Sequence, residues 1–378
     1  MSQPEDDLLS DDDSASDADL PPEIALLRDY LQLAAVANEP ELQMVQARAR
    51  QLGAFFAATI QARSVSTARS QEVVERIADA DAGGFARLVD LPKQLGDFEI
   101  FEHVDIGGMG AVYRACQRST GRVVAIKIIA PHRQDSVEAQ RRFRREGQLA
   151  LGLRHPHLVE VLAAGEEAGR AYLAMEFLAG SDLARVAAEQ GPLVVADACE
   201  LIRQAALGVD FLNQQGFVHR DLKPSNLMLS GTPATVKVLD LGLVHDAGET
   251  ALSELTQSRQ ILGTYDYLAP EQARDSRAVD GRADIYSLGC TLYRLLAGFA
   301  PFSRVGGGSP ATILIAHQLD TAPALNSLRP EIPVELAAIV ARAMAKQPAD
   351  RFATAGELAN ALVVFSAGAK LDRLLELT

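Results

Sequence analysis

The stretch His219-Arg220-Asp221-Leu222-Lys223-Pro224-Ser225-Asn226, followed further on by Asp240-Leu241-Gly242, decides the fold of this chain. It places a carboxylate, an ammonium group and an amide in one short loop, with a second carboxylate close behind. Phosphoryl transfer needs such a set, because one group orients and deprotonates the attacking hydroxyl and another neutralises the moving phosphoryl group. Two oxygen ligands must also hold Mg²⁺. The stretch therefore predicts a phosphoryl-transfer site.

The spacing within this stretch resembles the catalytic-loop pattern H-R-D-L-x-x-x-N of protein kinases. Within that superfamily, the chain is similar to the bacterial serine/threonine kinases of eukaryotic (Hanks) type. The resemblance covers about residues 98 to 365. It implies an α+β, bilobal protein kinase fold, with a small antiparallel β-sheet lobe that carries one regulatory helix and a larger, mainly helical lobe.

Composition divides the chain into segments. Residues 1–20 hold eight acidic side chains and no Lys or Arg. They cannot bury enough apolar surface to offset their ordering entropy, so we expect a disordered acidic tail. Residues 21–90 carry apolar positions at helical spacing, which predicts a short helical N-terminal extension. The other expected boundaries are a kinase domain at 98–366, divided into an N-lobe at 98–177 and a C-lobe at 178–366, and a C-terminal tail at 367–378.

Alternation of apolar and polar residues predicts strands in the first part of the kinase domain. A basic helix is expected at 136–153, and the chain beyond Asp182 is expected to be mostly helical apart from the catalytic and activation segments. The expected strands are 98–104, 111–115, 123–129, 158–163 and 171–177.

A glycine-rich stretch is similar to the loop that covers the nucleotide in kinases. Glycines let a hairpin backbone approach the phosphates and donate N–H groups without a Cβ clash. A tight hairpin explains a lone glycine loop equally well, but the register with Lys127 favours the nucleotide role. Asp105 replaces the first glycine of the family pattern, and we expect its charge to weaken ATP binding without abolishing it. The loop residues implied to contact ATP are Ile106, Gly107, Gly108, Met109 and Gly110.

Lys127, at the end of Val124-Ala125-Ile126-Lys127, matches the strand lysine that contacts the α- and β-phosphates of ATP. The resemblance gives it Glu146 of the following helix as an ion-pair partner. It also implies a ribose contact at Asp182. The implied adenine pocket consists of Val112, Ala125, Met175 and Met228, with hinge backbone from Glu176 to Leu178.

The resemblance assigns the chemistry to four residues of the opening stretch. Asp221 is the expected catalytic base, and Lys223 offsets charge on the γ-phosphoryl group. Asn226 and Asp240 supply oxygen ligands for Mg²⁺. Lys223, together with Thr264, is typical of serine/threonine rather than tyrosine specificity.

Three further residues are implied to have structural roles. Glu271, in Ala269-Pro270-Glu271, is expected to form a buried ion pair with Arg351. Asp284 is expected to hold the backbone of the catalytic loop. None of the three is expected to take part in the chemistry.

Arg220, directly before Asp221, indicates control by phosphorylation, because an arginine there carries an uncompensated charge until a phosphate arrives. Thr256 and Ser258 lie at the spacing before Gly263 where bacterial kinases of this type autophosphorylate. They are the candidate activation-loop sites.

Bulk composition excludes several classes of protein. The net charge of −14 argues against general affinity for nucleic acid or anionic membranes. A run of about 18 apolar residues is absent, and the N-terminus lacks an apolar signal segment, so we expect no membrane span and a cytoplasmic protein. The three cysteines lie far apart without a CxxC pair, which fits a reducing compartment.

We therefore expect an ATP- and Mg²⁺-dependent protein serine/threonine kinase that acts on protein substrates and autophosphorylates in trans within a homodimer. Two alternatives stay open. A pseudokinase that acts as a nucleotide-sensing scaffold is favoured only by Asp105, since every charged or amide residue of the expected site is present. A kinase fold acting on a small molecule is disfavoured by the intact segment 263–271.

Overall fold

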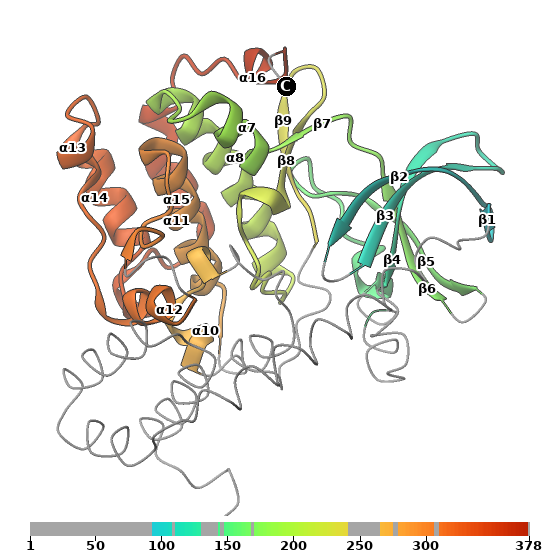
Figure 1. The fold of residues 1–378 in the computed structure, drawn as a ribbon, viewed down its shortest axis with the longest axis horizontal. Helices are drawn as coiled ribbons and strands as arrows, with labels where there is room; N and C mark the ends of the chain where they lie inside the picture. Colours follow the sequence, from blue (N-terminus) through green and yellow to red (C-terminus); the bar gives the residue numbers. More distant parts are fainter. Residues whose placement is uncertain are drawn as a thin grey trace, which may run out of the picture.

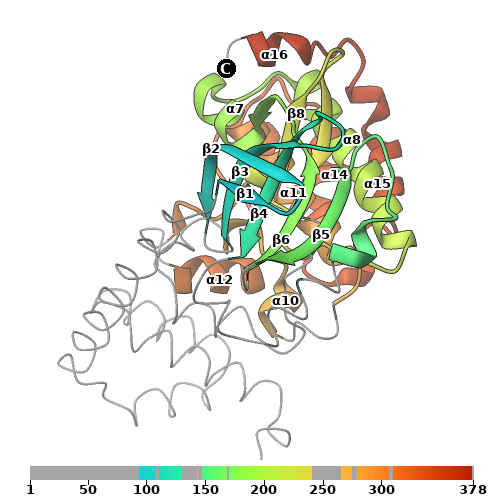
Figure 2. The same cartoon turned by 90° about the vertical axis from the view of Figure 1, so that its right-hand side faces the viewer.

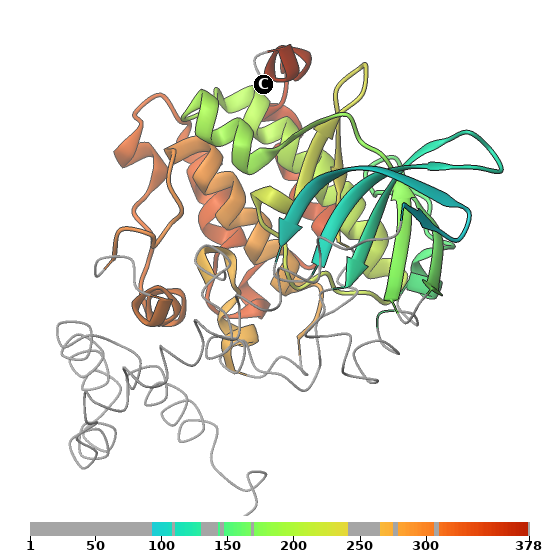
Figure 3. The same ribbon diagram turned by 45° about the vertical axis from the view of Figure 1, so that its right-hand side comes forward.

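A computed structural model describes residues 93–107, 110–129, 143, 147–167, 170–240, 265–274, 279–305 and 310–376. The predicted acidic tail and helical extension lie outside these residues. The described part forms two lobes, one built on a sheet and one mainly helical, as expected (Figures 1 and 3).

The small lobe is a six-stranded antiparallel sheet with the strand order β1-β2-β3-β4-β6-β5 (Figure 1). Its central strand β4 lies where the sequence predicts it. Val124, Ile126 and Ile128 of β4 pack in one cluster, whereas Ala125 and Ile129 join the larger core. Successive side chains point to opposite faces of a strand, so β4 is covered on both faces. The strands are β1 (Gln94–Leu95), β2 (Phe98–Gly107), β3 (Gly110–Gln117), β4 (Val123–Ile129), β5 (Val161–Glu167) and β6 (Arg170–Glu176).

Strand β2 is longer than predicted and is interrupted by two β-bulges. The register with β3 skips Phe101 and Val104, and both of these side chains are at least half exposed. A bulge adds one unpaired residue and breaks the two-residue alternation. The predicted strand ends at residue 104, where the alternation is broken, whereas β2 continues to Gly107.

The predicted strand at 158–163 is displaced in the structure, where β5 begins at Val161. Leu158 instead forms an isolated parallel bridge with Val238. The backbone hydrogen bonds of this segment go to the large lobe: Val159 N donates to Val238 O at 3.0 Å, and Val238 N donates to His157 O at 2.9 Å. Of the predicted helix at 136–153, Phe143 and residues 147–153 are described. Phe143 and residues 147–150 are helical, whereas residues 151–153 are not, so the helix ends before the predicted boundary.

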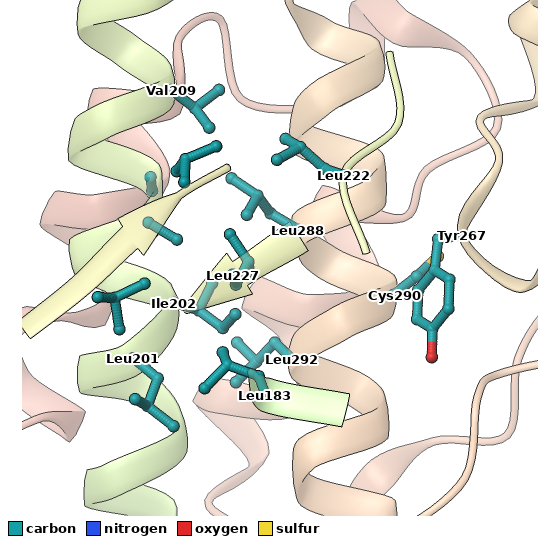
Figure 4. Packing of buried hydrophobic residues seen from close by; sticks show 14 of the residues in the cluster. Leu183, Leu201, Ile202, Val209, Leu222, Leu227, Tyr267, Leu288, Cys290 and Leu292 are labelled. Atoms are coloured by element: carbon teal, nitrogen blue, oxygen red, sulfur yellow. The ribbon is translucent and has the colours of Figure 1, made fainter. Parts of the chain in front are cut away.

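The large lobe packs around two helices, α8 and α11. Figure 4 shows Ile202 and Val209 of α8 facing Leu288 and Leu292 of α11, with Leu227 between them. A second sheet, with the order β7-β8-β9, lies beside them. Its strands are β7 (Gly180–Asp182), β8 (Leu227–Ser230) and β9 (Thr235–Val238). The helices are α7 (Leu183–Gln190), α8 (Val195–Gln214), α10 (Pro270–Arg274), α11 (Arg282–Ala297), α12 (Pro310–Leu319), α13 (Leu325–Leu328), α14 (Val334–Ala343), α15 (Ala355–Leu362) and α16 (Asp372–Glu376), with 3₁₀ turns at η1 (Pro224–Asn226), η3 (Tyr265–Tyr267), η6 (Pro348–Asp350) and η7 (Val363–Phe365).

The predicted C-terminal tail is packed against the large lobe as far as residue 376. Leu371 and Leu374 are buried, and α16 lies at the end of the three-stranded sheet β7-β8-β9 (Figures 1 and 2). Asp197 of α8, 1% exposed, accepts hydrogen bonds from Lys370 N at 2.8 Å and from the Arg373 guanidinium. Among the described helices, none is long and apolar enough to cross a membrane.

Candidate functional site

The catalytic loop lies between α8 and β8 and brings three predicted residues into contact. Lys223 Nζ lies 3.0 Å and 2.9 Å from the two carboxylate oxygens of Asp221. Asn226 Nδ2 donates to Asp221 O at 2.7 Å and to Asp221 Oδ2 at 3.0 Å. The Asp221 side chain is only 9% exposed. A carboxylate, an ammonium group and an amide thus form one hydrogen-bonded unit.

Asp284 anchors the backbone of this loop. Its carboxylate, which is completely buried, accepts hydrogen bonds from His219 N and Arg220 N, both at 2.9 Å, and from Asn213 Nδ2 at 3.0 Å. Burial raises the pKa of Asp284, while these N–H donors act in the opposite direction. The structure places Asp284 at the position that the sequence interpretation requires.

His219 joins the catalytic loop to the segment that carries Asp240. Its Nε2 lies 2.7 Å from Leu239 O, and its Nδ1 lies 3.3 Å from Asp221 N. Because Nε2 must donate to a carbonyl, Nδ1 is the acceptor for Asp221 N–H. His219 is fully buried and holds two site residues in register.

Two residues of the site have left-handed backbone conformations although neither is glycine. The φ angles are 66° at Arg220 and 49° at Asp240. Such conformations cost about 1–3 kcal/mol each and persist only where the surroundings impose them. At Arg220 the surroundings include Asp284 and Gln272, whose Nε2 donates to Arg220 O at 2.7 Å.

Lys127 contacts Asp240, the predicted metal ligand. Lys127 Nζ lies 2.7 Å from Asp240 Oδ1, and the two side chains are 9% and 34% exposed. Burial raises the pKa of the Asp240 carboxyl, but the ammonium of Lys127 outweighs this, so the pKa lies below its ordinary value. The predicted partner of Lys127, Glu146, lies outside the described residues. Sequence reasoning missed the Lys127–Asp240 contact, and no local pattern signals it.

The predicted adenine-pocket residues come from both lobes. Ala125 on β4 lies directly opposite Met175 on β6, and each is 8% exposed. Met228 on β8 lies opposite Asp182 on β7. Val112 on β3 pairs with Lys127 in the strand register. Val112, Ala125 and Met175 therefore lie on the same face of the small-lobe sheet as Lys127, whereas Met228 and Asp182 lie together on the second sheet.

Asp182 also has a structural role that the sequence interpretation did not include. Its Oδ1 accepts hydrogen bonds from Ala184 N at 2.9 Å and Arg185 N at 3.0 Å, which caps the start of α7. A ribose hydroxyl would therefore bind to the other carboxylate oxygen, Oδ2.

The glycine-rich stretch joins β2 to β3. Gly107 pairs with Gly110 across the hairpin, while Gly108 and Met109 lie outside the described residues. Asp105 is exposed and lies opposite Val112. The hairpin thus places the Asp105 charge next to a predicted adenine contact.

The Glu271–Arg351 ion pair predicted from the sequence is present. Arg351 Nη1 and Nη2 lie 2.6 Å and 2.8 Å from the two Glu271 oxygens. Thr256, Ser258 and Thr264 lie outside the described residues.

Comparisons with known proteins identify the family of this chain. The family model described as a protein kinase domain matches residues 98–362. The serine/threonine-protein kinase PknJ of Mycobacterium tuberculosis is 36% identical over 278 residues, which cover 73% of this chain and 46% of PknJ. PknB of the same organism is 38% identical over 278 residues, covering 72% of this chain and 43% of PknB. The chain thus spans less than half the length of these relatives.

A solved structure is also similar. The crystal structure of the PknI kinase domain of Mycobacterium tuberculosis matches with a TM-score of 0.58 and 28% identity, covering 73% of this chain and 99% of that one. The two-lobed fold is therefore shared with an experimentally determined structure.

Proposed function

Because this chain belongs to the protein kinase family, we propose that it transfers the γ-phosphoryl group of ATP to Ser and Thr hydroxyls of proteins. One observation carries the proposal: Lys223 Nζ and Asn226 Nδ2 both lie within 3.0 Å of the Asp221 carboxylate. The relatives described as serine/threonine-protein kinases support the choice of acceptor. A pseudokinase has only Asp105 in its favour.

In this mechanism, Asp221 orients the acceptor hydroxyl and accepts its proton. Lys223 brings a positive charge beside the group being transferred. Both side chains are held in place before substrate arrives, since Asp284 and His219 fix the loop backbone. Positioning and charge stabilisation would supply most of the rate enhancement.

Protein kinases use ATP together with a divalent metal, and the residues of this site fit Mg²⁺. Asn226 turns its amide nitrogen toward Asp221, which leaves its side-chain oxygen for a metal. Asp240 offers a second hard oxygen. Among the described residues there is no group of three or more His, Cys, Asp or Glu that could hold a metal, so phosphate and water oxygens would complete the coordination. When bound, Mg²⁺ would neutralise charge developing on the phosphates.

The nucleotide would be held by residues from both lobes. Lys127 would move from Asp240 to the phosphates or bridge the two. Burial of apolar side chains around adenine and backbone hydrogen bonds from the hinge would supply affinity. The residues assigned to ATP are Ile106, Gly107, Gly108, Met109, Gly110, Val112, Ala125, Lys127, Met175, Glu176, Leu178, Asp182 and Met228, with Glu146 as the partner of Lys127.

Regulation by autophosphorylation in trans is part of the proposal. Thr256 and Ser258 would accept the phosphoryl group, and the Arg220 guanidinium would form an ion pair with the resulting phosphate. This would involve a transient homodimer. A cytoplasmic location fits three free cysteines, and the net charge of −14 disfavours nucleic acid as a partner. Mass spectrometry after incubation with ATP tests the acceptors: absence of phosphate on residues 250–258 would contradict this part of the proposal.

Labelled ATP, Mg²⁺ and a generic basic protein test the transfer itself. We expect Asp221→Asn to lower labelling about 100-fold or more, the usual size of a general-base effect. Asp280→Asn is the matched control, because Asp280 lies on the surface and pairs with Arg282. Equal labelling by wild type and Asp221→Asn would overturn the assignment.

A further inference from the structure

The three-stranded sheet of β7, β8 and β9 has one face that carries two of the residues assigned to the nucleotide, Asp182 and Met228. Asp182, Met228 and Lys237 lie directly opposite one another across β7, β8 and β9. Opposed residues in antiparallel strands project from the same face. All three are half-buried, whereas Leu227 and Val236, which flank them, are buried in the large-lobe core. Lys237 thus shares a face with the assigned ribose and adenine contacts.

Lys237 joins three segments of the chain. Its Nζ donates to Glu176 Oε1 at 2.7 Å and to Leu158 O at 3.2 Å. Glu176, the first residue of the hinge, also accepts a hydrogen bond from Glu160 N at 2.8 Å and donates its own N–H to Glu160 O at 2.9 Å. The start of the hinge, the segment before β5 and strand β9 are therefore held together by one ammonium and one carboxylate.

This pair is better shielded from water than an ordinary surface ion pair. The side chains of Lys237 and Glu176 are 20% and 18% exposed, whereas those of Arg282 and Asp280 are 37% and 54% exposed. Partly buried pairs are screened little by salt, and removing one partner leaves a poorly hydrated charge. The pair should therefore restrict the motion of Glu176.

Strand β9 is followed directly by Leu239 and by Asp240, the proposed metal ligand. Leu239, two residues after Lys237, donates its N–H to Asn226 O at 2.9 Å and accepts the His219 hydrogen bond. Asp240 follows directly. The hinge is thus connected through Lys237 to the strand that positions the metal ligands.

We propose that Lys237 is a positioning residue for the nucleotide, which fixes Glu176 so that the backbone of residues 176–178 is aligned to bind adenine. This rests on the proposed function, because it takes the face shared by Asp182, Met228 and Lys237 to be part of an ATP site. Without the ammonium, the Glu176 carboxylate turns toward water and the hinge backbone loses its alignment. We expect the substitution to weaken the binding of adenine rather than the binding of the phosphates.

Calorimetric binding of adenosine to the full chain isolates this end, since adenosine carries no phosphate. We expect Lys237→Met to weaken adenosine binding about tenfold, the lower end of the value of a hydrogen bond to a charged group. Lys237→Arg keeps the charge and should restore most of the affinity. In kinetics, the KM for ATP should rise by a similar factor while kcat stays within about twofold.

Lys346→Met is the matched control. Lys346 is also partly buried, and its Nζ donates to the carbonyls of Ala316 and His317 in α12, at 3.3 Å and 2.8 Å. It should change stability without changing adenosine affinity. If Lys237→Met fails to fold, Glu176→Gln replaces it: glutamine can still accept from Glu160 N but loses the ion pair, and should weaken adenosine binding about threefold.

An unchanged adenosine affinity in folded Lys237→Met would reduce Lys237 to a structural role and overturn the proposal. A raised kcat would do the same, because it would show that the pair restrains the enzyme. The proposed function fails separately: wild type that binds adenosine but transfers no phosphate refutes the kinase assignment, while the positioning role is still supported by the binding data. Wild type that does not bind adenosine refutes both.

Discussion

Replacing Arg351 by methionine should lower the free energy of unfolding by about 4 kcal/mol. The Arg351 side chain is 0% exposed. Besides both oxygens of Glu271, it donates to the carbonyls of Ala345 at 2.7 Å, Arg282 at 2.8 Å and Lys346 at 3.2 Å. Methionine can replace the aliphatic stem but none of these hydrogen bonds.

The magnitude follows from the groups that lose their partner, namely the Glu271 carboxylate and three backbone carbonyls. Removing one partner of a buried ion pair costs about 3–5 kcal/mol, because the other charge stays buried and unpaired. The Glu271 side chain is 21% exposed, so water can reach part of the carboxylate and reduce this cost. The three carbonyls lose their donor and increase it, which places the estimate near the middle of the range, at about 4 kcal/mol.

Urea denaturation followed by circular dichroism is the suitable assay, since the chain has no tryptophan to report by fluorescence. Arg282→Met is the control: its guanidinium and its partner Asp280 are 37% and 54% exposed, and such a pair is worth about 0–1 kcal/mol. Arg351→Lys keeps the charge but cannot form the two-pronged contact, so its loss should be intermediate. If Arg351→Met and Arg282→Met cost the same, the reasoning from burial is refuted.

Three other changes test separate parts of the structure. Asp105→Gly removes a negative charge from the hairpin that is expected to cover the nucleotide and should lower the KM for ATP about threefold or more; an unchanged or raised KM refutes this. Burial and, second, the nearby ammonium of Lys346 lower the pKa of His317 to about 3. His317 therefore stays neutral when folded but protonates below about pH 6.5 when unfolded, so stability present above pH 6.5 is lost as pH falls, by about 2 kcal/mol at pH 5. His317→Gln should remove that share of the pH dependence, and equal slopes for the two proteins would contradict it. Arg373→Met leaves the buried Asp197 carboxylate with one fewer cation and should cost about 2 kcal/mol in urea denaturation, discounted because Arg373 is 45% exposed; a loss below about 0.5 kcal/mol would count against it.

Elements with a dense local signal were predictable from the sequence. Strand β4 is a continuous β-branched run and lies at its predicted bounds. Strand β2 was predicted too short, because a bulge residue such as Phe101 or Val104 changes the face of every residue after it. Alternation in the sequence cannot show where pairing skips a residue.

Contacts between distant segments were predictable only where a family motif names both partners. Glu271–Arg351 was found in this way. Lys127–Asp240, Glu176–Lys237 and Asp197–Arg373 were not, because opposite charges far apart in the sequence can pair in many ways, and only the packed fold selects one. The described part of the fold thus contains ion pairs that no local sequence pattern indicates.

The hydrogen bonds that His219 N and Arg220 N donate to Asp284 affect hydrogen exchange in the catalytic loop. Asp284 lies in the first turn of α11, and every residue from Ala283 to Tyr293 in that helix is buried. The amide protons of His219 and Arg220 are therefore bound to an element that cannot open without disrupting the core. They should exchange with solvent only through unfolding of the whole large lobe, at the slow end of the protein's range. The catalytic loop would then keep its shape up to the temperature at which the large lobe melts, and heat inactivation would coincide with that melting.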